Sequence, residues 1–181
     1  MSDSIFQQSY FEIFSIAVST QPDLDQLKET NRQLQQKVHP DRFANSSEEE
    51  KRNAMQITSL INQAFETLKK PTLRLQYMLS LKGVDMNAET DTSMDGAFLM
   101  QQMELREEIA DIRSQSDPLD VLETMRADLK NESAMLIASF DAVYQQNALD
   151  EGREIIRKMQ FLNKAQKEIS DATIQLEDEF I

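Results

Sequence analysis

The residues best suited to chemistry or recognition stand together at positions 37–43, with the sequence Lys-Val-His-Pro-Asp-Arg-Phe. His39 is the only histidine among 181 residues, and Pro40 and Asp41 follow it directly. No nucleophile stands beside His39 in the sequence, as covalent catalysis would require. Pro40 stiffens the segment, which lowers the entropy lost when it docks on a partner. These residue types therefore favour recognition over catalysis.

Pro40 also defines the local backbone. Proline lacks an N–H donor, clashes with the preceding helical turn and disfavours helical angles at the residue before it. A helix must therefore end near Val38 and leave His39 and Asp41 on a short exposed loop. The tripeptide alone is a weak motif and is more often an ordinary turn, so its meaning depends on the flanking elements.

Those flanking elements predict a helical hairpin with the loop at its tip. Apolar residues recur at spacings of three and four on both sides of the loop. Ser47, with Glu50 three residues later, is typical of a helix start and predicts a helix over about 47–69. The core residues predicted for the two helices are Leu24, Leu27, Leu34, Val38, Ala54, Ile57, Leu60, Ile61, Ala64, Phe65 and Leu68.

Two further helices complete the first domain. An aromatic-rich helix of two or three turns is expected at about 10–16, and another begins at Pro71 and ends at Gly83. Residues 84–94 are polar and acidic without a sustained period, which is typical of a linker. The expected N-terminal domain therefore covers residues 1–83.

The remaining residues, 95–181, predict an antiparallel bundle of three long helices. The first covers about 95–114, the second starts at Asp117–Pro118, and the third starts near Asn147. The apolar stripe predicted for the third helix is Ile155, Met159, Leu162, Ile169 and Leu176. With only three glycines and four prolines in the chain, the composition also favours an all-α protein.

Charge is distributed unevenly between the two expected domains. Residues 1–82 carry ten acidic and ten basic side chains, whereas residues 83–181 carry 22 acidic and nine basic ones. This asymmetry predicts two modules with different partners. It also argues against a nucleic-acid surface on the acidic C-terminal module.

Several classes of function are disfavoured by composition. Without cysteine and with one histidine, the chain has no disulfides and no ordinary zinc site, so no metal and no cofactor are expected. No run reaches the ~18 apolar residues of a membrane span, and no targeting segment is apparent. The expected protein is soluble and cytoplasmic. It lacks the motifs of a catalytic triad or a phosphate-binding loop.

The helix at 95–114 has two apolar faces. A rotation of about 100° per residue places Phe98, Leu105, Ile109 and Ile112 on one stripe, which is the predicted bundle core. Leu99, Met100 and Met103 fall on roughly the opposite side. This second face is either packed inside the protein or exposed for a partner. Glu107 beside it favours exposure, because an unpaired carboxylate is rarely buried.

These residues permit a comparison with known families. The segment 37–43, followed by Ile61–Leu68 and then Pro71, Arg74 and Tyr77, resembles a J-domain; Val38 stands where members typically carry tyrosine. Over essentially the whole chain, the segments Tyr77–Gly83, Ala97–Glu108 and Arg157–Lys164 resemble the iron-sulfur co-chaperone family HscB, in its bacterial form without an N-terminal cysteine-rich motif.

The HscB resemblance implies a co-chaperone without catalytic activity of its own. It would bring the iron-sulfur scaffold IscU to HscA, a DnaK-class ATPase chaperone, and stimulate ATP hydrolysis by HscA. The implied chaperone-binding residues are His39, Pro40, Asp41, Lys28, Arg32, Lys37 and Arg42. The implied scaffold-binding residues are Leu99, Met100, Met103, Glu104, Arg106, Glu107 and Phe161. Met94 stands where relatives can carry a basic contact residue.

Two alternatives differ in partner and in class. The first is a J-domain protein that serves a different client, which a binding assay with the scaffold would reveal. The second is a purely structural helical protein that engages no chaperone, which an absence of ATPase stimulation would favour. An enzyme is the least favoured class, and intrinsic turnover without a chaperone would be needed to support it.

Overall fold

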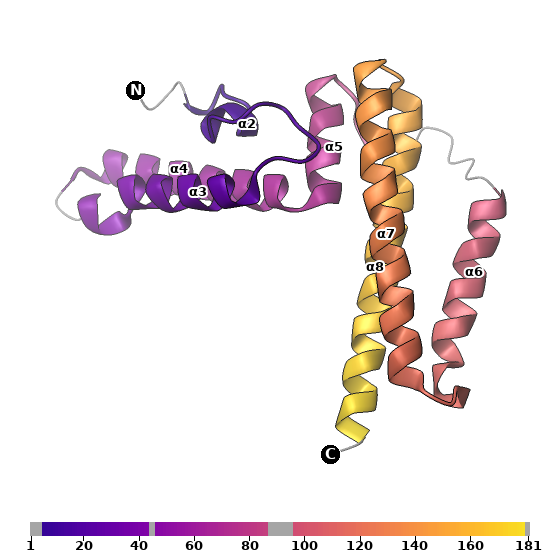
Figure 1. Cartoon of the computed structure of the whole chain (residues 1–181). Coiled ribbons are helices and arrows are strands. Elements are labelled where there is room, and N and C mark those ends of the chain that lie inside the picture. The colour runs from indigo at the N-terminus through magenta and orange to yellow at the C-terminus, as the bar shows by residue number, and fades with distance from the viewer. Residues whose placement is uncertain (1–4, 44–45, 87–95, 180–181) are drawn as a thin grey trace. The chain divides into compact units, whose positions relative to one another are not determined.

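The computed structural model describes residues 5–43, 46–86 and 96–179, and its regular elements are helices (Figure 1). No strand occurs within these ranges, so the all-α prediction is confirmed. Contacts between residues divide the chain into two compact units, Met1–Met78 and Leu79–Ile181.

The N-terminal unit contains the predicted hairpin. Helices α3 (Leu24–Val38) and α4 (Glu48–Lys69) lie side by side and antiparallel (Figure 1). The Asp23 carboxylate caps α3 by accepting hydrogen bonds from the N–H groups of its first turn. Ser47 and Glu50 form the predicted capping box at the start of α4. Local capping therefore defines where both helices begin.

Helix α2 (Tyr10–Ile13) is shorter than the two or three turns predicted. Ser15 follows it in the left-handed region, with φ of 54°, and lets the N–H of Ile16 bond back to the carbonyl of Phe11. A left-handed residue of this kind ends a helix. The aromatic side chains of Phe11 and Phe14 are still fully buried, so the segment anchors the unit although it is barely helical.

The core of the hairpin matches the predicted stripes only in part. Leu27, Ile61 and Leu68 are completely buried, as expected. Leu24, by contrast, is 43% exposed, because it occupies the first turn of α3, where the helix has just left the preceding loop. The prediction that Leu24 belongs to the core is therefore wrong.

A buried arginine joins distant parts of the N-terminal unit. Arg74, on helix α5 (Pro71–Leu81), donates to the carbonyl of Thr20 through Nε and Nη2, at 3.1 and 2.8 Å. Its Nη1 donates to the carbonyl of Leu68 in the last turn of α4. Burial lowers the pKa of Arg74 to about 10, so the guanidinium remains charged at neutral pH.

The C-terminal unit is a three-helix bundle of α6 (Gly96–Ala110), α7 (Pro118–Gln145) and α8 (Leu149–Glu179). Helix α6 ends earlier than the predicted 95–114 helix, and a 3₁₀ helix, η2 (Ile112–Ser114), follows it. The tighter turn still keeps Ile112 in the core, at 4% exposure. Helix α7 starts at Asp117–Pro118, as predicted, and the Asp117 side chain caps it.

The bundle core is continuous from η2 to the C-terminal part of α8. Its buried residues are Ile112, Leu122, Met125, Leu129, Leu162, Ala165, Ile169 and Leu176. Near the start of α8, Ile156 is fully buried and the predicted Ile155 is only partly buried, because Ile156 lies three residues before the buried Met159 and shares its face.

The predicted linker, residues 84–94, stays a prediction. Val84 is buried, and its N–H donates to the carbonyl of Leu79 at 3.1 Å. Residues 87–94, including Met94, lie outside the described residues. Within the described parts of the chain, no helix is both long and apolar enough to cross a membrane.

Candidate functional site

The His39 turn follows directly from the end of α3. His39 caps the helix with φ of −57° and ψ of 133°, the extended conformation that a following proline favours. A 3₁₀ turn, η1 (Pro40–Phe43), comes next, and the N–H of Arg42 donates to the carbonyl of His39 at 3.0 Å. The predicted helix end at Val38 is confirmed, and His39 is exposed. The side chains of Pro40 and Asp41 lie outside the described part of the chain.

Two of the predicted basic residues form ion pairs within α3. Lys28 contacts Asp25 at 2.9 Å, and Arg32 binds Glu29 through Nε and Nη2 at 2.9 and 2.7 Å. The hydrogen bonds from Arg32 lower the pKa of Glu29 to about 2 and raise the pKa of Arg32 itself. Both pairs are exposed, so they orient the side chains more than they stabilise the fold.

The predicted basic residues do not share one flank of the helix. Lys28 and Arg32 lie about 40° apart around α3, whereas Lys37 lies about 180° from Lys28. Arg42 leaves the turn and donates through Nη1 to the carbonyl of Gln36 at 3.4 Å. Lys37 and Arg42 therefore lie next to the His39 turn in the sequence. Lys28 and Arg32 lie together on another side of α3, earlier in the helix.

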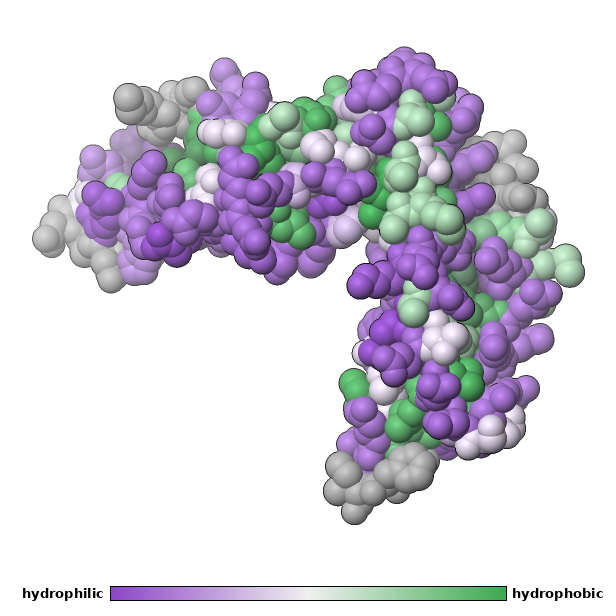
Figure 2. All heavy atoms as spheres, viewed as in Figure 1, coloured by the Kyte–Doolittle hydropathy of each residue, from purple (hydrophilic) through white to green (hydrophobic). Residues whose placement is uncertain are grey.

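The second apolar face of α6 is exposed. Leu99, Met100 and Met103 are 45, 64 and 63% exposed. Phe98, on the face of α6 turned toward the bundle, is only 5% exposed. The alternative that this face packs against another bundle helix is therefore wrong. In the view of Figure 2, apolar residues reach the surface around α6, whereas most of the visible surface is hydrophilic.

The polar residues predicted beside this face are exposed as well. Glu104, Arg106 and Glu107 all reach solvent on α6. Phe161, on α8, is half-buried and packs edge-on against Phe98, with ring centroids 5.6 Å apart. The structure therefore brings Phe161 close to α6 through the buried face of that helix.

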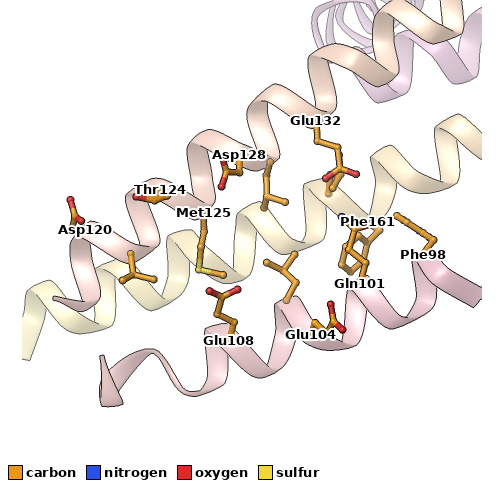
Figure 3. A pocket seen from close by; sticks show the side chains of 14 residues that line it. Phe98, Gln101, Glu104, Glu108, Asp120, Thr124, Met125, Asp128, Glu132 and Phe161 are labelled. Atoms are coloured by element: carbon orange, nitrogen blue, oxygen red, sulfur yellow. The ribbon is translucent and has the colours of Figure 1, made fainter. Parts of the chain in front are cut away.

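Two features of this region were missed in the sequence. The Lys158 ammonium lies over the Phe98 ring, 5.4 Å from its centroid. Lys158 stands one helical turn before Phe161, and this spacing is the sequence signal that could have indicated its place in the site. A groove of about 380 Å³ also lies between α6, α7 and α8, and Glu104 and Phe161 line it (Figure 3). Its acidic residues on α7 repeat every fourth or eighth position, a pattern visible in the sequence.

Comparisons with known proteins agree with this architecture. Residues 94–170 match the family described as the HSCB C-terminal oligomerisation domain. A co-chaperone protein HscB homolog from Shewanella loihica is 40% identical over 171 residues, which cover 91% of this chain and 96% of the relative. The homolog from Aeromonas hydrophila is 37% identical over 161 residues, covering 89% and 94% of the two chains.

Solved structures extend the likeness to three dimensions. The chaperone HscB from Vibrio cholerae superposes with a TM-score of 0.84 at 33% identity, covering 96% of this chain and all of the other. The human co-chaperone protein HscB gives a TM-score of 0.83 at 28% identity, covering 93% and 83%. Both the fold class and the resemblance noted in the sequence are confirmed, and the family is one of co-chaperones rather than enzymes. The chain belongs to the HscB co-chaperone family.

Proposed function

We propose that this protein brings the iron-sulfur scaffold IscU to the DnaK-class chaperone HscA and stimulates ATP hydrolysis by HscA. The observation that carries the proposal is the exposed face of Leu99, Met100 and Met103, which belongs to a different compact unit from the exposed His39 turn. Two separate surfaces suit a protein that must hold a chaperone and a cargo at the same time. We also place this activity in the cytoplasm.

The chaperone contact is assigned to His39, Pro40 and Asp41. The hydrogen bond that closes the turn after His39 limits its motion, which lowers the entropy lost on docking. The basic residues Lys28, Arg32, Lys37 and Arg42 are assigned to steering toward an acidic surface of the chaperone. Such steering weakens as salt screens the charges.

The scaffold contact is assigned to Leu99, Met100 and Met103. Flexible methionine side chains adapt to the shape of a partner, and an exposed apolar cluster with charged neighbours is typical of a protein interface. The charged and aromatic neighbours assigned to the same contact are Glu104, Arg106, Glu107 and Phe161.

The test is the ATPase rate of purified HscA with the protein, with IscU and with both together. The protein should accelerate hydrolysis, and the scaffold should increase the acceleration more than additively. His39→Gln should abolish stimulation while leaving the circular dichroism spectrum and scaffold binding unchanged. Met55→Ala, at an exposed position of α4 assigned to neither partner, is the control and should stimulate normally.

If His39→Gln stimulated HscA fully, the assignment of the chaperone contact to this turn would be wrong. No stimulation by the wild-type protein would overturn the proposed function as a whole. Stimulation without any effect of the scaffold would favour a J-domain protein with a different client.

A further inference from the structure

The groove between α6 and α7 combines an apolar floor with acidic walls (Figure 3). The buried side chains of Met125, Leu129 and Leu162 form its floor, and the half-buried ring of Phe161 also lines it. With a volume of about 380 Å³, the groove has room for side chains of a partner. The groove is partly open to solvent.

Carboxylates line both walls. Asp120, Asp128 and Glu132 come from α7, at separations of eight and four residues that keep them on one face of the helix. Glu104 and Glu108 come from α6, four residues apart. Figure 3 shows the Glu108 carboxylate reaching from α6 toward α7, and the Asp128 side chain beside α7.

These carboxylates have no cationic partner among the described residues. In the ranges that the structure describes, none of the five forms an ion pair or a side-chain hydrogen bond. The lining residues include no lysine or arginine. Five like charges around one groove repel one another, so a cationic partner would relieve this repulsion.

The arrangement does not suit a single metal ion. No group of three or more acidic or histidine side chains in the described ranges could hold one. A second copy of the C-terminal unit is also disfavoured, because it would bring the same excess of 22 acidic over nine basic side chains in residues 83–181. The geometry instead suits positive charges spread along a peptide segment.

We propose that the groove receives a basic segment of the iron-sulfur scaffold, with lysine or arginine side chains on the acidic walls and an apolar side chain on the floor. The inference rests on the proposed function, because Glu104 and Phe161 belong both to the groove and to the assigned scaffold contact. The scaffold-binding surface then continues from the exposed face of α6 onto α7.

The test replaces two α7 carboxylates by their amides. Asp128→Asn with Glu132→Gln removes two charges and keeps side-chain size. Isothermal titration calorimetry with purified IscU should give an affinity about tenfold weaker than wild type at low salt. The double variant should also lose less affinity than wild type when salt is raised from about 0.05 to 0.3 M, because fewer charge pairs remain to be screened.

The matched control removes the same number of charges elsewhere. The control variant carries Glu123→Gln and Asp178→Asn, at exposed positions of α7 and α8 outside the groove. It should bind IscU as wild type does at both salt concentrations. Equal affinities of the two double variants would overturn the groove proposal. If alanine at Leu99, Met100 and Met103 still abolished binding, the proposed function would stand; no binding by wild type would overturn both.

Discussion

The phenolic oxygen of Tyr77 on α5 accepts a hydrogen bond from the backbone N–H of Tyr10 at 2.8 Å, and the two rings stack with centroids 4.2 Å apart. This N–H begins α2 and has no partner inside its own helix. A helix of four residues is not stable alone, so tertiary contacts must hold it. Burial raises the pKa of Tyr77, and the hydroxyl stays neutral at physiological pH.

Tyr77→Phe should lower the free energy of unfolding by about 1 kcal/mol, because it keeps the stacked ring but removes the acceptor for Tyr10. Urea denaturation followed by circular dichroism measures the change. Tyr144→Phe is the control, since the Tyr144 hydroxyl bonds no described residue. Equal losses in the two variants would show that the hydroxyl of Tyr77 contributes nothing specific.

Arg74→Met should destabilise the N-terminal unit by about 3 kcal/mol. The substitution removes three hydrogen bonds and leaves the carbonyls of Thr20 and Leu68 without their donor. Arg74→Lys should recover only part of the loss, because an ammonium cannot reproduce the planar fork. Chemical denaturation measures both, with exposed Arg52→Met as a control within about 0.5 kcal/mol of wild type.

The Glu29 carboxyl should titrate near pH 2 instead of its ordinary 4.5. The hydrogen bonds from Arg32 favour the charged form, so the pair stabilises α3 above the ordinary pKa and its contribution is lost as pH falls toward 2. NMR of the side-chain carboxyl carbon measures the midpoint. Arg32→Gln should move it back toward 4.5; an ordinary midpoint in wild type would contradict the pairing.

Alanine at Leu99, Met100 and Met103 should weaken IscU binding at least tenfold, because it removes the apolar contact area proposed for the scaffold. The melting temperature should stay near that of wild type, since all three side chains are exposed. Calorimetry and thermal unfolding separate the two effects. Alanine at Met55 and Met135, which are equally exposed elsewhere, should leave IscU binding unchanged.

Gly152→Leu should destabilise the C-terminal unit by about 1–3 kcal/mol. A Cβ at Gly152 would lie 3.2 Å from Leu79 Cδ2 and 3.5 Å from Phe140 Cε2, so a larger side chain must displace both. Gly96→Ala is the control, because a Cβ there meets nothing within 4 Å. Thermal unfolding measures the difference, and equal melting temperatures would contradict the packing described for α8.

Most helix starts could be predicted because their determinants are local. The Ser47–Glu50 box and Asp117 before Pro118 lie within one turn of the helices that they start. The break at the end of α6 could not be predicted, because residues 111–114 contain neither proline nor glycine. It accompanies the burial of Ile112, which depends on how the chain packs and not on its neighbours in sequence.

The candidate site could likewise be predicted only where local sequence determines it. Helical spacing separated the two apolar faces of α6 and predicted Phe98 in the core, but the choice between burial and exposure of Met100 depended on tertiary structure. The acidic α7 wall was missed for a related reason. Which face of α7 lines the groove depends on tertiary packing, in which Leu129 belongs to the core, so the regular spacing of Asp128 and Glu132 carried no meaning alone.

The exposure of Met100 and Met103 also makes their thioether sulfurs accessible to peroxide. Oxidation to the sulfoxide converts a flexible apolar side chain into a polar one, and methionine sulfoxide reductases reverse it. The property that suits this face of α6 to an adaptable partner thus also makes it sensitive to oxidants. We expect peroxide treatment to release bound scaffold while leaving the buried Met159 and the bundle around it intact.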